Sequence, residues 1–212
     1  MNTELQAKIR KAYRNHRLEH GKKPASIYKF CKDLGIKEEE FYECYGSFDS
    51  LEKDFWVAYF EETMQKVEKD ADVFTAYNTK EKLLAIYFTW LEVLKSNRSY
   101  ILIDKQQYCD LRTAPSMFKS FKARFLEIAD GLIQQGIEEQ MVKDRVLLTS
   151  KYKDGLWLLT FNVLQFWLKD DSPSFSATDA YVEKSVNLFF EMVKENAFDM
   201  SFDLVKFMYQ NR

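Results

Sequence analysis

Glycine and proline are scarce in this chain of 212 residues, and that scarcity limits the folds open to it. Only six glycines and three prolines are present. Sandwiches and barrels need many tight hairpin turns, which depend on glycine and on Asn-Gly or Asp-Gly pairs. With 46% hydrophobic and 16% aromatic residues, the chain is also too apolar for a disordered class. We therefore predict a globular chain of one or two domains with a sizeable core.

Apolar residues recur at helical spacing along most of the sequence, and no segment alternates for long enough to predict a sheet. The first helix is expected to end at Gly21, and Ser26 is a plausible N-cap for a short second helix. A third short helix is expected from near Lys37, and a long fourth one from about Asp49 to about Asp72. The remaining helices are expected near residues 79–95, 98–109, 116–135, 147–169 and 177–195, with a short one near 199–210.

Charge is distributed unevenly although the net charge is only −2. Residues 1–37 carry ten basic and three acidic side chains, whereas residues 38–54 carry seven acidic side chains and one lysine. A basic segment favours a polyanionic partner, and an acidic segment opposes one. The charge pattern therefore points in two directions.

Several features predict a cytoplasmic protein without stable membrane insertion. Three cysteines, an odd and small number, fit a reducing cytosol better than a disulfide framework. The N-terminus is charged from Glu4 onward, unlike a secretory signal peptide. The longest apolar stretch free of charges, 155–168, is shorter than the roughly 20 residues that span a membrane.

Residues 27–45 have the spacing of a helix-turn-helix, in which the second helix can enter a major groove about 12 Å wide. The turn is Gly35-Ile36. The apolar positions of the two helices are Ile27, Phe30, Leu34, Phe41 and Tyr45.

Residues 5–56 resemble the N-terminal DNA-binding domain of the TetR family of transcriptional regulators. The residues that carry the resemblance are Gly21, Ser26, Gly35-Ile36, Phe41-Tyr42, Tyr45 and Ser47-Phe48-Asp49-Ser50-Leu51. An all-helical remainder of about 150 residues is also what the family has. The helical periodicity and the resemblance together predict an all-α fold of about nine to ten helices. It divides the chain into a helix-turn-helix domain, 1–50, and a helical ligand-binding and dimerisation domain, 51–212.

The sequence departs from the family pattern in and around the recognition helix. Lys37 replaces the serine that would cap this helix, and a cation there opposes the helix dipole by about 0.3–1 kcal/mol. Phe48 replaces a lysine that family members often place against phosphate. Four acidic residues follow in the helix itself: Glu38, Glu39, Glu40 and Glu43.

Two interpretations of the module remain open, because DNA affinity comes largely from neutralised phosphates. In the first, basic side chains bind phosphates, Tyr42 adds a contact, and a glutamate can accept a hydrogen bond from cytosine. In the second, the module keeps its fold without a DNA role. The predicted DNA-binding residues are Lys8, Lys11, Arg14, Ser26, Lys29, Lys37, Glu38 and Tyr42.

The family's second domain resembles a helical ligand cage, and the middle of this chain is rich in aromatic residues. We predict a pocket for a small apolar ligand there. Aromatic residues at helical spacing are also the ordinary content of a core, and this alternative stays open for each residue. The predicted pocket residues are Tyr87, Phe88, Trp90, Leu91, Tyr108, Met117, Phe121, Phe125, Trp157 and Phe161.

The family's last two long helices pair with a second subunit, and residues 156–168 are apolar on nearly every side of a helix. Such a helix is buried on all sides, either by a partner subunit or within one chain. The predicted homodimer interface consists of Leu164, Trp167, Val182, Val186, Phe189 and Phe190.

No motif of catalysis or cofactor binding is present in the sequence. We find no phosphate-binding glycine loop, nucleophile elbow or Cys-x-x-Cys pair. His16 and His20 have a spacing that can bind a metal, but no further ligand completes a site. We expect that the protein is not an enzyme and that it binds neither a cofactor nor a metal. The leading hypothesis is a repressor released from its operator by an apolar effector. The alternative is a protein of the same fold that has lost DNA binding and binds a lipid or isoprenoid-like ligand, or a protein partner.

Overall fold

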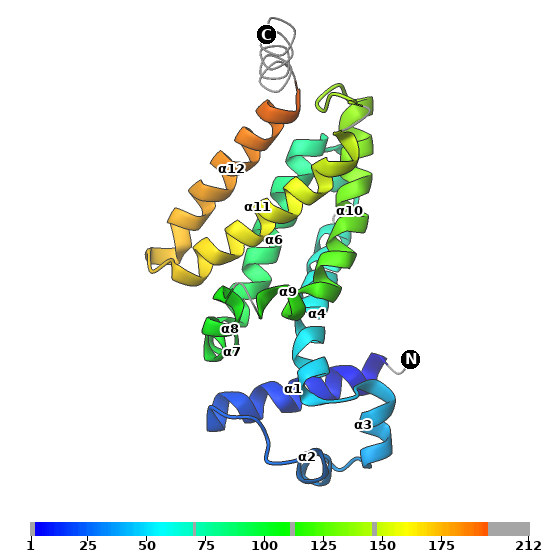
Figure 1. Ribbon diagram of the computed structural model, residues 1–212, viewed down its shortest axis with the longest axis vertical. Helices are drawn as coiled ribbons and strands as arrows, with labels where there is room; N and C mark the ends of the chain where they lie inside the picture. The colour runs from blue at the N-terminus through cyan, green and yellow to red at the C-terminus, as the bar shows by residue number, and fades with distance from the viewer. Residues whose placement is uncertain (1–2, 70, 111–112, 146–147, 195–212) are drawn as a thin grey trace, which may run out of the picture. The chain divides into compact units, whose positions relative to one another are not determined.

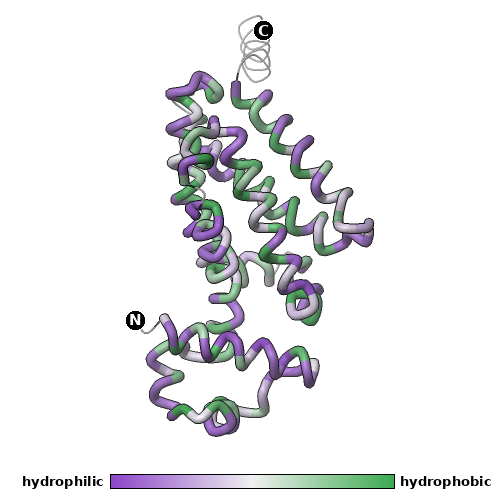
Figure 2. Tube along the Cα trace, turned by 180° about the vertical axis from the view of Figure 1, so that it is seen from behind, coloured by the Kyte–Doolittle hydropathy of each residue, from purple (hydrophilic) through white to green (hydrophobic). Residues whose placement is uncertain are grey.

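The computed structural model describes residues 3–69, 71–110, 113–145 and 148–194, and the described part is helical without a strand. It contains twelve α-helices and one short 3₁₀ helix, η1. Figure 2 shows hydrophilic and hydrophobic residues alternating in short stretches along the long helices, as expected of amphipathic helices. The elements are α1 Thr3–His20, α2 Ile27–Leu34, α3 Glu38–Cys44, α4 Phe48–Lys69, α5 Ala71–Ala76, α6 Thr79–Ser96, α7 Arg98–Ile103, α8 Lys105–Cys109, α9 Ala114–Met117, α10 Lys119–Glu138, α11 Thr149–Lys169, η1 Pro173–Phe175 and α12 Ser176–Lys194 (Figure 1).

The all-α prediction is confirmed, and the described helices are slightly more numerous than expected. The segment predicted as one helix over 98–109 is divided at Asp104 into α7 and α8, because Asp104 has non-helical dihedrals (φ −112°, ψ 23°). Phe118 separates α9 from α10 in the same way. The short helix α5 was not expected, and the helix predicted near 199–210 lies outside the described residues.

Helix ends near the N-terminus follow local capping chemistry. Gly21 (φ +66°) closes α1, and Gly35 (φ +71°) closes α2 in the left-handed conformation that glycine adopts at least cost. The Ser26 hydroxyl accepts a hydrogen bond of 3.1 Å from the Lys29 amide, as predicted for an N-cap. These three caps bracket α1 and α2 at the positions read from the sequence.

α4 begins at Phe48, one residue earlier than expected, because Ser47 and Ser50 cap it reciprocally. The Ser47 amide donates to Ser50 Oγ over 3.0 Å, and the Ser50 amide donates to Ser47 Oγ over 3.1 Å. Two donors at the helix start are thereby satisfied. The aromatic ring of Phe48 contacts the rings of Phe30 and Phe41, at centroid distances of 5.6 and 5.7 Å. Phe48 therefore serves the packing of the module, not a phosphate contact.

The chain divides into two compact units. The first unit comprises Met1–Glu62 and Glu92–Lys122, and the second comprises Thr63–Leu91 and Ala123–Arg212. The first unit contains α1, α2, α3 and α7 to α9, and α2 and α3 lie on one side of α1 (Figure 1). The second unit contains α11 and α12, which form a helical hairpin (Figure 1).

Both units have apolar cores with a few satisfied polar groups. In the first unit, the ring of Trp56 meets Tyr108 and Phe118 edge-on at 4.9 and 4.8 Å. In the second unit, the buried hydroxyls of Tyr87 and Thr160 are hydrogen-bonded over 2.9 Å. Among the residues that the structure describes, no helix has both the length and the apolar character to cross a membrane.

Candidate nucleic-acid interface

α2, the turn at Gly35 and α3 form a helix-turn-helix whose inner side chains hold it on α1. Phe30 and Phe41 are buried, and their rings lie edge-to-face at 6.2 Å. The ring of Phe30 also meets the buried ring of Tyr13 of α1 edge-on, at 6.1 Å. With the apolar sides fixed in this way, the opposite sides of α2 and α3 face solvent. The large exposed residues there are Tyr28, 62% exposed, and Tyr42, 53% exposed.

Most of the predicted DNA-binding cations are exposed. Lys8 and Lys11 lie on the exposed side of α1, Lys29 is exposed on α2, and Lys37 is exposed at the start of α3. Arg14 differs, since it is half-buried and its Nη1 donates to Asn97 Oδ1 over 2.6 Å. The guanidinium of Arg14 thus connects α1 to the residue that precedes α7.

The three remaining predicted residues have different environments. Ser26 is occupied as the cap of α2. Tyr42 is exposed, whereas Glu38 is half-buried in the first turn of α3. Tyr28 was not predicted. Tyr28 lies two positions after the cap Ser26, between the inward-facing residues Ile27 and Phe30. This spacing is the signal from which an outward-facing tyrosine could have been predicted.

The four glutamates of α3 have distinct roles. Glu40 Oε2 accepts a hydrogen bond of 2.9 Å from the Lys37 amide, so it completes one half of a capping box in which Lys37 supplies no side-chain bond. The acidic first turn also complements the positive end of the helix dipole. Glu39 and Glu43, spaced four residues apart, are exposed on the same face of the helix. Of the four glutamates, only Glu39 and Glu43 are exposed, and neither side chain caps the helix.

A polar cluster fixes the end of α3 against α1 and α4. Asp54 Oδ2 accepts hydrogen bonds from Arg10 Nη1 and from the Tyr45 hydroxyl, each over 2.7 Å. Burial and the bond to Asp54 raise the pKa of Tyr45, so this hydroxyl keeps its proton. Sequence reasoning treated Tyr45 as an apolar position and did not find this cluster, whose members lie up to 44 residues apart.

A second, more buried cluster connects α1 to α4 and to the break between α7 and α8. Arg17 is 3% exposed and bonds Glu52 Oε1 over 2.6 Å and Asp104 Oδ2 over 2.8 Å. Glu52 also accepts from the Tyr13 hydroxyl at 2.6 Å and from Lys23 Nζ at 2.8 Å. A buried pair of this kind is costly to break, because each partner would leave an uncompensated charge. α1 is therefore held by charge-assisted bonds at both Arg10 and Arg17.

The predicted ligand-pocket residues are divided between the two units, so the pocket as a whole stays a prediction. Tyr108, Met117 and Phe121 belong to the first unit and are buried. In the second unit, the rings of Phe125 and Trp157 lie 6.0 Å apart. Of the other five residues, all in the second unit, three are buried: Tyr87, Trp90 and Leu91. Phe88 and Phe161 are half-buried.

The residues predicted for the dimer interface all belong to α11 or α12, two helices that contact each other. Five of the six are buried: Leu164, Trp167, Val182, Val186 and Phe190. The sixth, Phe189, is half-buried and lies close to Gly155, where an added Cβ would be 3.4 Å from the ring. Five of the six are thus already buried within one chain, and their part in a dimer stays a prediction.

Other apolar residues of the same two helices remain exposed. Leu158 and Leu188 are each 61% exposed, Met192 is 39% exposed and Phe166 is 36% exposed. The ring of Phe166 stacks on Tyr181 at 4.5 Å with an interplanar angle of 6°. The sequence showed that α11 is apolar on nearly every side, which includes Leu158 and Phe166. Periodicity alone could not predict which side of α11 faces α12 and which side stays exposed.

Comparisons with known proteins agree with the arrangement of these helices. Residues 82–208, more than half of the chain, match the family model described as the tetracyclin repressor-like C-terminal domain. No match was found among curated proteins.

Solved structures share the fold at low sequence identity. A protein from Syntrophomonas wolfei assigned to the TetR family of transcriptional regulators has a TM-score of 0.64 and 15% identity, over 91% of this chain and 96% of that one. A transcriptional regulator from Cytophaga hutchinsonii has a TM-score of 0.54 and 16% identity, over 88% and 97%. A bacterial regulatory protein of the TetR family from Rhodococcus RHA1 has a TM-score of 0.53 and 13% identity, over 92% and 100%. With the family model covering most of the chain, the protein belongs to the TetR family of transcriptional regulators.

Proposed function

We propose that this protein is a repressor that binds operator DNA as a homodimer and releases it when a small apolar effector binds. The observation that carries the proposal is the exposed face of the helix-turn-helix, where Tyr28, Lys29, Lys37 and Tyr42 face solvent while Phe30 and Phe41 fix the module from within. Lysines and tyrosines of this kind bind phosphates and set the register of a protein on a duplex. We expect no catalytic activity and a cytoplasmic location.

The acidic recognition helix fits DNA better than its charge suggests. Glu40 is bonded to the start of its own helix, which leaves Glu39 and Glu43 as the exposed acids on the face that carries Tyr42. A carboxylate can accept a hydrogen bond from the cytosine amino group in the major groove. We therefore propose that the operator places cytosines opposite Glu39 and Glu43, and that the basic side chains of α1 and α2 supply the phosphate contacts.

For the homodimer, we propose the exposed apolar residues of α11 and α12 as the shared surface. Leu158, Phe166, Leu188 and Met192 are exposed on two adjacent helices, and a two-fold axis would pair this surface with its own copy. Two recognition helices would then bind half-sites about 34–36 Å apart, or a multiple of that distance. A small tilt of α4 in each subunit would break this register.

For the release step, we propose that α1 carries the movement to the helix-turn-helix. Arg17 bonds Glu52 of α4 and Asp104 between α7 and α8, so a shift of either segment pulls directly on α1. The predicted pocket residues would receive the effector. Because Arg17 is bonded to both segments, a shift of one relative to the other would move α1 or strain these bonds.

The second candidate is a protein of this fold that has lost DNA binding, with a lipid or isoprenoid-like ligand or a basic protein partner. The exposed Glu39 and Glu43 favour it, because uncompensated acids repel a polyanion. The two candidates differ in what the exposed face of α3 does.

The test is selection of binding sites from random duplex DNA, followed by a salt titration of the selected site. The proposed repressor yields a defined sequence and a steep fall of affinity with salt. Lys37→Gln should reduce the slope of log affinity against log salt by about one. Lys184→Gln, an exposed lysine of α12, is the matched control and should leave the slope unchanged. Weak association without sequence preference would contradict the proposal and support the second candidate.

A further inference from the structure

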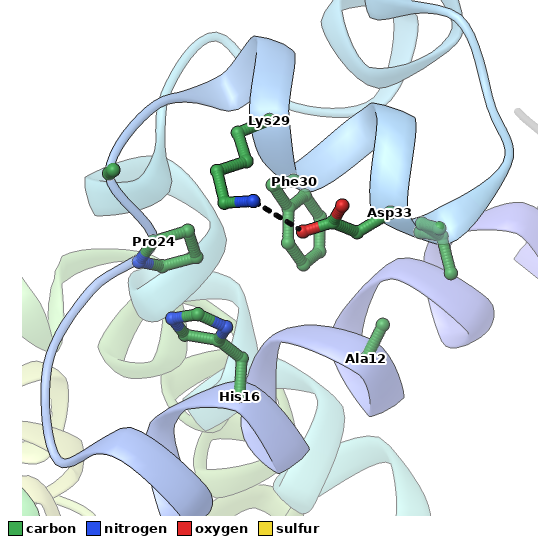
Figure 3. Close-up of a pocket in the computed structure, with 8 residues that line it drawn as sticks. Ala12, His16, Pro24, Lys29, Phe30 and Asp33 are labelled. Atoms are coloured by element: carbon green, nitrogen blue, oxygen red, sulfur yellow. Dashed lines mark ion pairs between the residues drawn. The ribbon is translucent and has the colours of Figure 1, made fainter.

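A small cleft lies within the helix-turn-helix unit, between α1 and α2 (Figure 3). Its volume is about 160 Å³. Its apolar lining includes Phe30, which is 5% exposed, Pro24, which is buried, and Ala12 and Leu34, which are half-buried. All of these residues belong to the first unit, so the cleft does not depend on any other part of the molecule.

The cleft exists because the side chains around it are small or held elsewhere. α1 contributes only the methyl group of Ala12 and the ring of His16. The ring of Phe30 is held toward the core by Tyr13, Phe41 and Phe48, at centroid distances of 6.1, 6.2 and 5.6 Å. The space that remains is similar to a cavity of roughly 150 Å³ that accepts benzene in another protein. It therefore has room for one six-membered aromatic ring.

The rim of the cleft carries one positive and one negative group. Lys29 Nζ and Asp33 Oδ2, one turn apart on α2, form an ion pair of 3.6 Å with exposed fractions of 65% and 62%. An exposed pair this long contributes little stability, so its charges can be exchanged for those of a ligand at small cost. In Figure 3 the His16 ring of α1 faces this pair across the cleft, and Pro24 closes one end.

His16 adds a neutral hydrogen-bonding group on the opposite wall. Burial and the neighbouring His20, whose ring centroid lies 4.4 Å away, lower the pKa of His16. Glu19, Asp33 and Arg17 act on the same ring, the two carboxylates raising its pKa and the arginine lowering it. At neutral pH the imidazole is therefore uncharged and can donate or accept one hydrogen bond.

We propose that this cleft is a binding site for a small aromatic zwitterion, a molecule with one phenyl ring, one ammonium and one carboxylate. The ring would lie on Phe30 and Pro24, the carboxylate on Lys29 and the ammonium on Asp33. An aromatic acid alone would satisfy Lys29 but lie close to the carboxylate of Asp33, and an aromatic amine would have the opposite conflict. A zwitterion replaces one loose ion pair with two and leaves the net charge of the site unchanged.

The site would also act on DNA binding, and this consequence rests on the proposed function. Lys29 is one of the cations proposed to bind phosphate, and its side chain is exposed. A carboxylate bound in the cleft would hold the ammonium of Lys29 away from the duplex. One phosphate contact fewer lowers affinity and makes it less dependent on salt.

The binding test uses three probes that share a phenyl ring: L-phenylalanine, 2-phenylethylamine, which lacks the carboxylate, and 3-phenylpropionate, which lacks the ammonium. Each is titrated into the ¹⁵N-labelled full chain, and the amide shifts of α1 and α2 are followed. Ligands of this size bind in the millimolar range at an exposed cleft. We expect L-phenylalanine to bind about twofold to fivefold more tightly than either control, since each exposed ion pair contributes little. Equal affinities for all three, or no saturable shift in α1 and α2, would overturn the proposal.

Two pairs of variants test whether the probe binds in this cleft. Ala12→Leu fills the cleft and should abolish binding, whereas Ala7→Leu, at an exposed position of the same helix, should preserve it. Asp33→Asn, at an exposed position that leaves the core intact, should strengthen 3-phenylpropionate binding relative to L-phenylalanine. Lys32→Gln, one residue away, should not. If Asp33→Asn has the same preference for L-phenylalanine over 3-phenylpropionate as the wild type, the ammonium does not bind Asp33. This result holds even if Ala12→Leu fails to fold.

The effect of the ligand on DNA binding is measured in a separate experiment. With a selected operator, saturating L-phenylalanine should weaken binding by the wild-type chain and have no effect on Lys29→Gln; an equal effect on both chains would overturn the link through Lys29. A chain that binds no DNA would contradict the proposed function, while the titrations would still decide whether the cleft binds the zwitterion.

Discussion

In the first unit, a buried charge network adds to the aromatic packing of the helices, whereas α11 and α12 of the second unit bury mainly apolar side chains and share a polar contact, from Thr178 to Asp170. Arg17 bonds Glu52 and Asp104 in the first unit, and Val186 and Leu164 are buried in the second. A hydrogen-bonded charge network satisfies its members in only one arrangement, while an apolar contact tolerates small shifts at constant volume. The comparison teaches that charge-assisted bonds supplement apolar packing around α1, and that apolar burial predominates between α11 and α12.

Breaking the ionic network is expected to have the largest effect. Arg17→Met leaves the carboxylates of Glu52 and Asp104 without their guanidinium, so we expect a loss of about 3–5 kcal/mol in the free energy of unfolding. Arg14→Met removes the single bond from Arg14 to Asn97 and should cost about 1.5–3 kcal/mol. Urea denaturation measures both values. Equal losses would mean that the network has no special weight in the first unit.

Apolar positions of the second unit should divide into two classes. Leu164→Ala opens a cavity in the core of the second unit and should cost about 2–5 kcal/mol of stability. Leu158→Ala, at a position 61% exposed, should leave the chain's own stability nearly unchanged but weaken the proposed dimer. Denaturation and sedimentation equilibrium separate the two effects. A dimer unaffected by Leu158→Ala would exclude this face as the shared surface.

Two glycines of α10 give a matched test of close packing in the second unit. A Cβ at Gly136 would lie 2.6 Å from Val142 Cγ2, whereas a Cβ at Gly131 would meet nothing within 4 Å. Gly136→Ala should therefore cost about 1–3 kcal/mol. Gly131→Ala should stabilise the helix by about 0.5–1 kcal/mol. Thermal unfolding of the two variants should show shifts of opposite sign, and shifts of the same sign would contradict the close contact.

The smallest effect concerns pH and Asp170, a buried carboxylate at the junction of α11 and α12. Asp170 accepts bonds from the Thr178 hydroxyl at 2.6 Å and the Thr178 amide at 2.9 Å. Burial opposes ionisation of Asp170, but the bonds from Thr178 and Ser172 outweigh it and lower its pKa to about 2. Its contribution is therefore complete above the usual value of 3.8 and is lost as the pH falls toward 2.

Asp170→Asn checks this expectation. Stability measured between pH 5 and about 2 should fall less steeply in the variant than in the wild type. At neutral pH the variant should be less stable by about 0.5–2 kcal/mol, the usual value of a lost cap. Parallel pH curves for the two proteins would show that Asp170 is not the titrating group.

Local chemistry could be read from the sequence, and contacts between distant residues could not. Ser26 and Gly35 have short-range signatures, and the helix ends lie where those signatures place them. The bond from Arg17 to Asp104 joins residues 87 positions apart, so no periodicity could reveal it. The apolar residues of α11 were recognised as a set, but the side that α12 covers depends on the turn at 170–175, whose geometry has no pattern in the sequence.

Lys37 stands at a position where two requirements compete. As the N-cap of α3 it supplies no side-chain bond, and Glu40 alone closes the start of the helix. Lys37→Ser would complete the capping box and stabilise the helix, yet it would remove a cation from the face proposed to meet phosphates. The residue at this one position thus trades stability of the recognition helix against attraction to a polyanion.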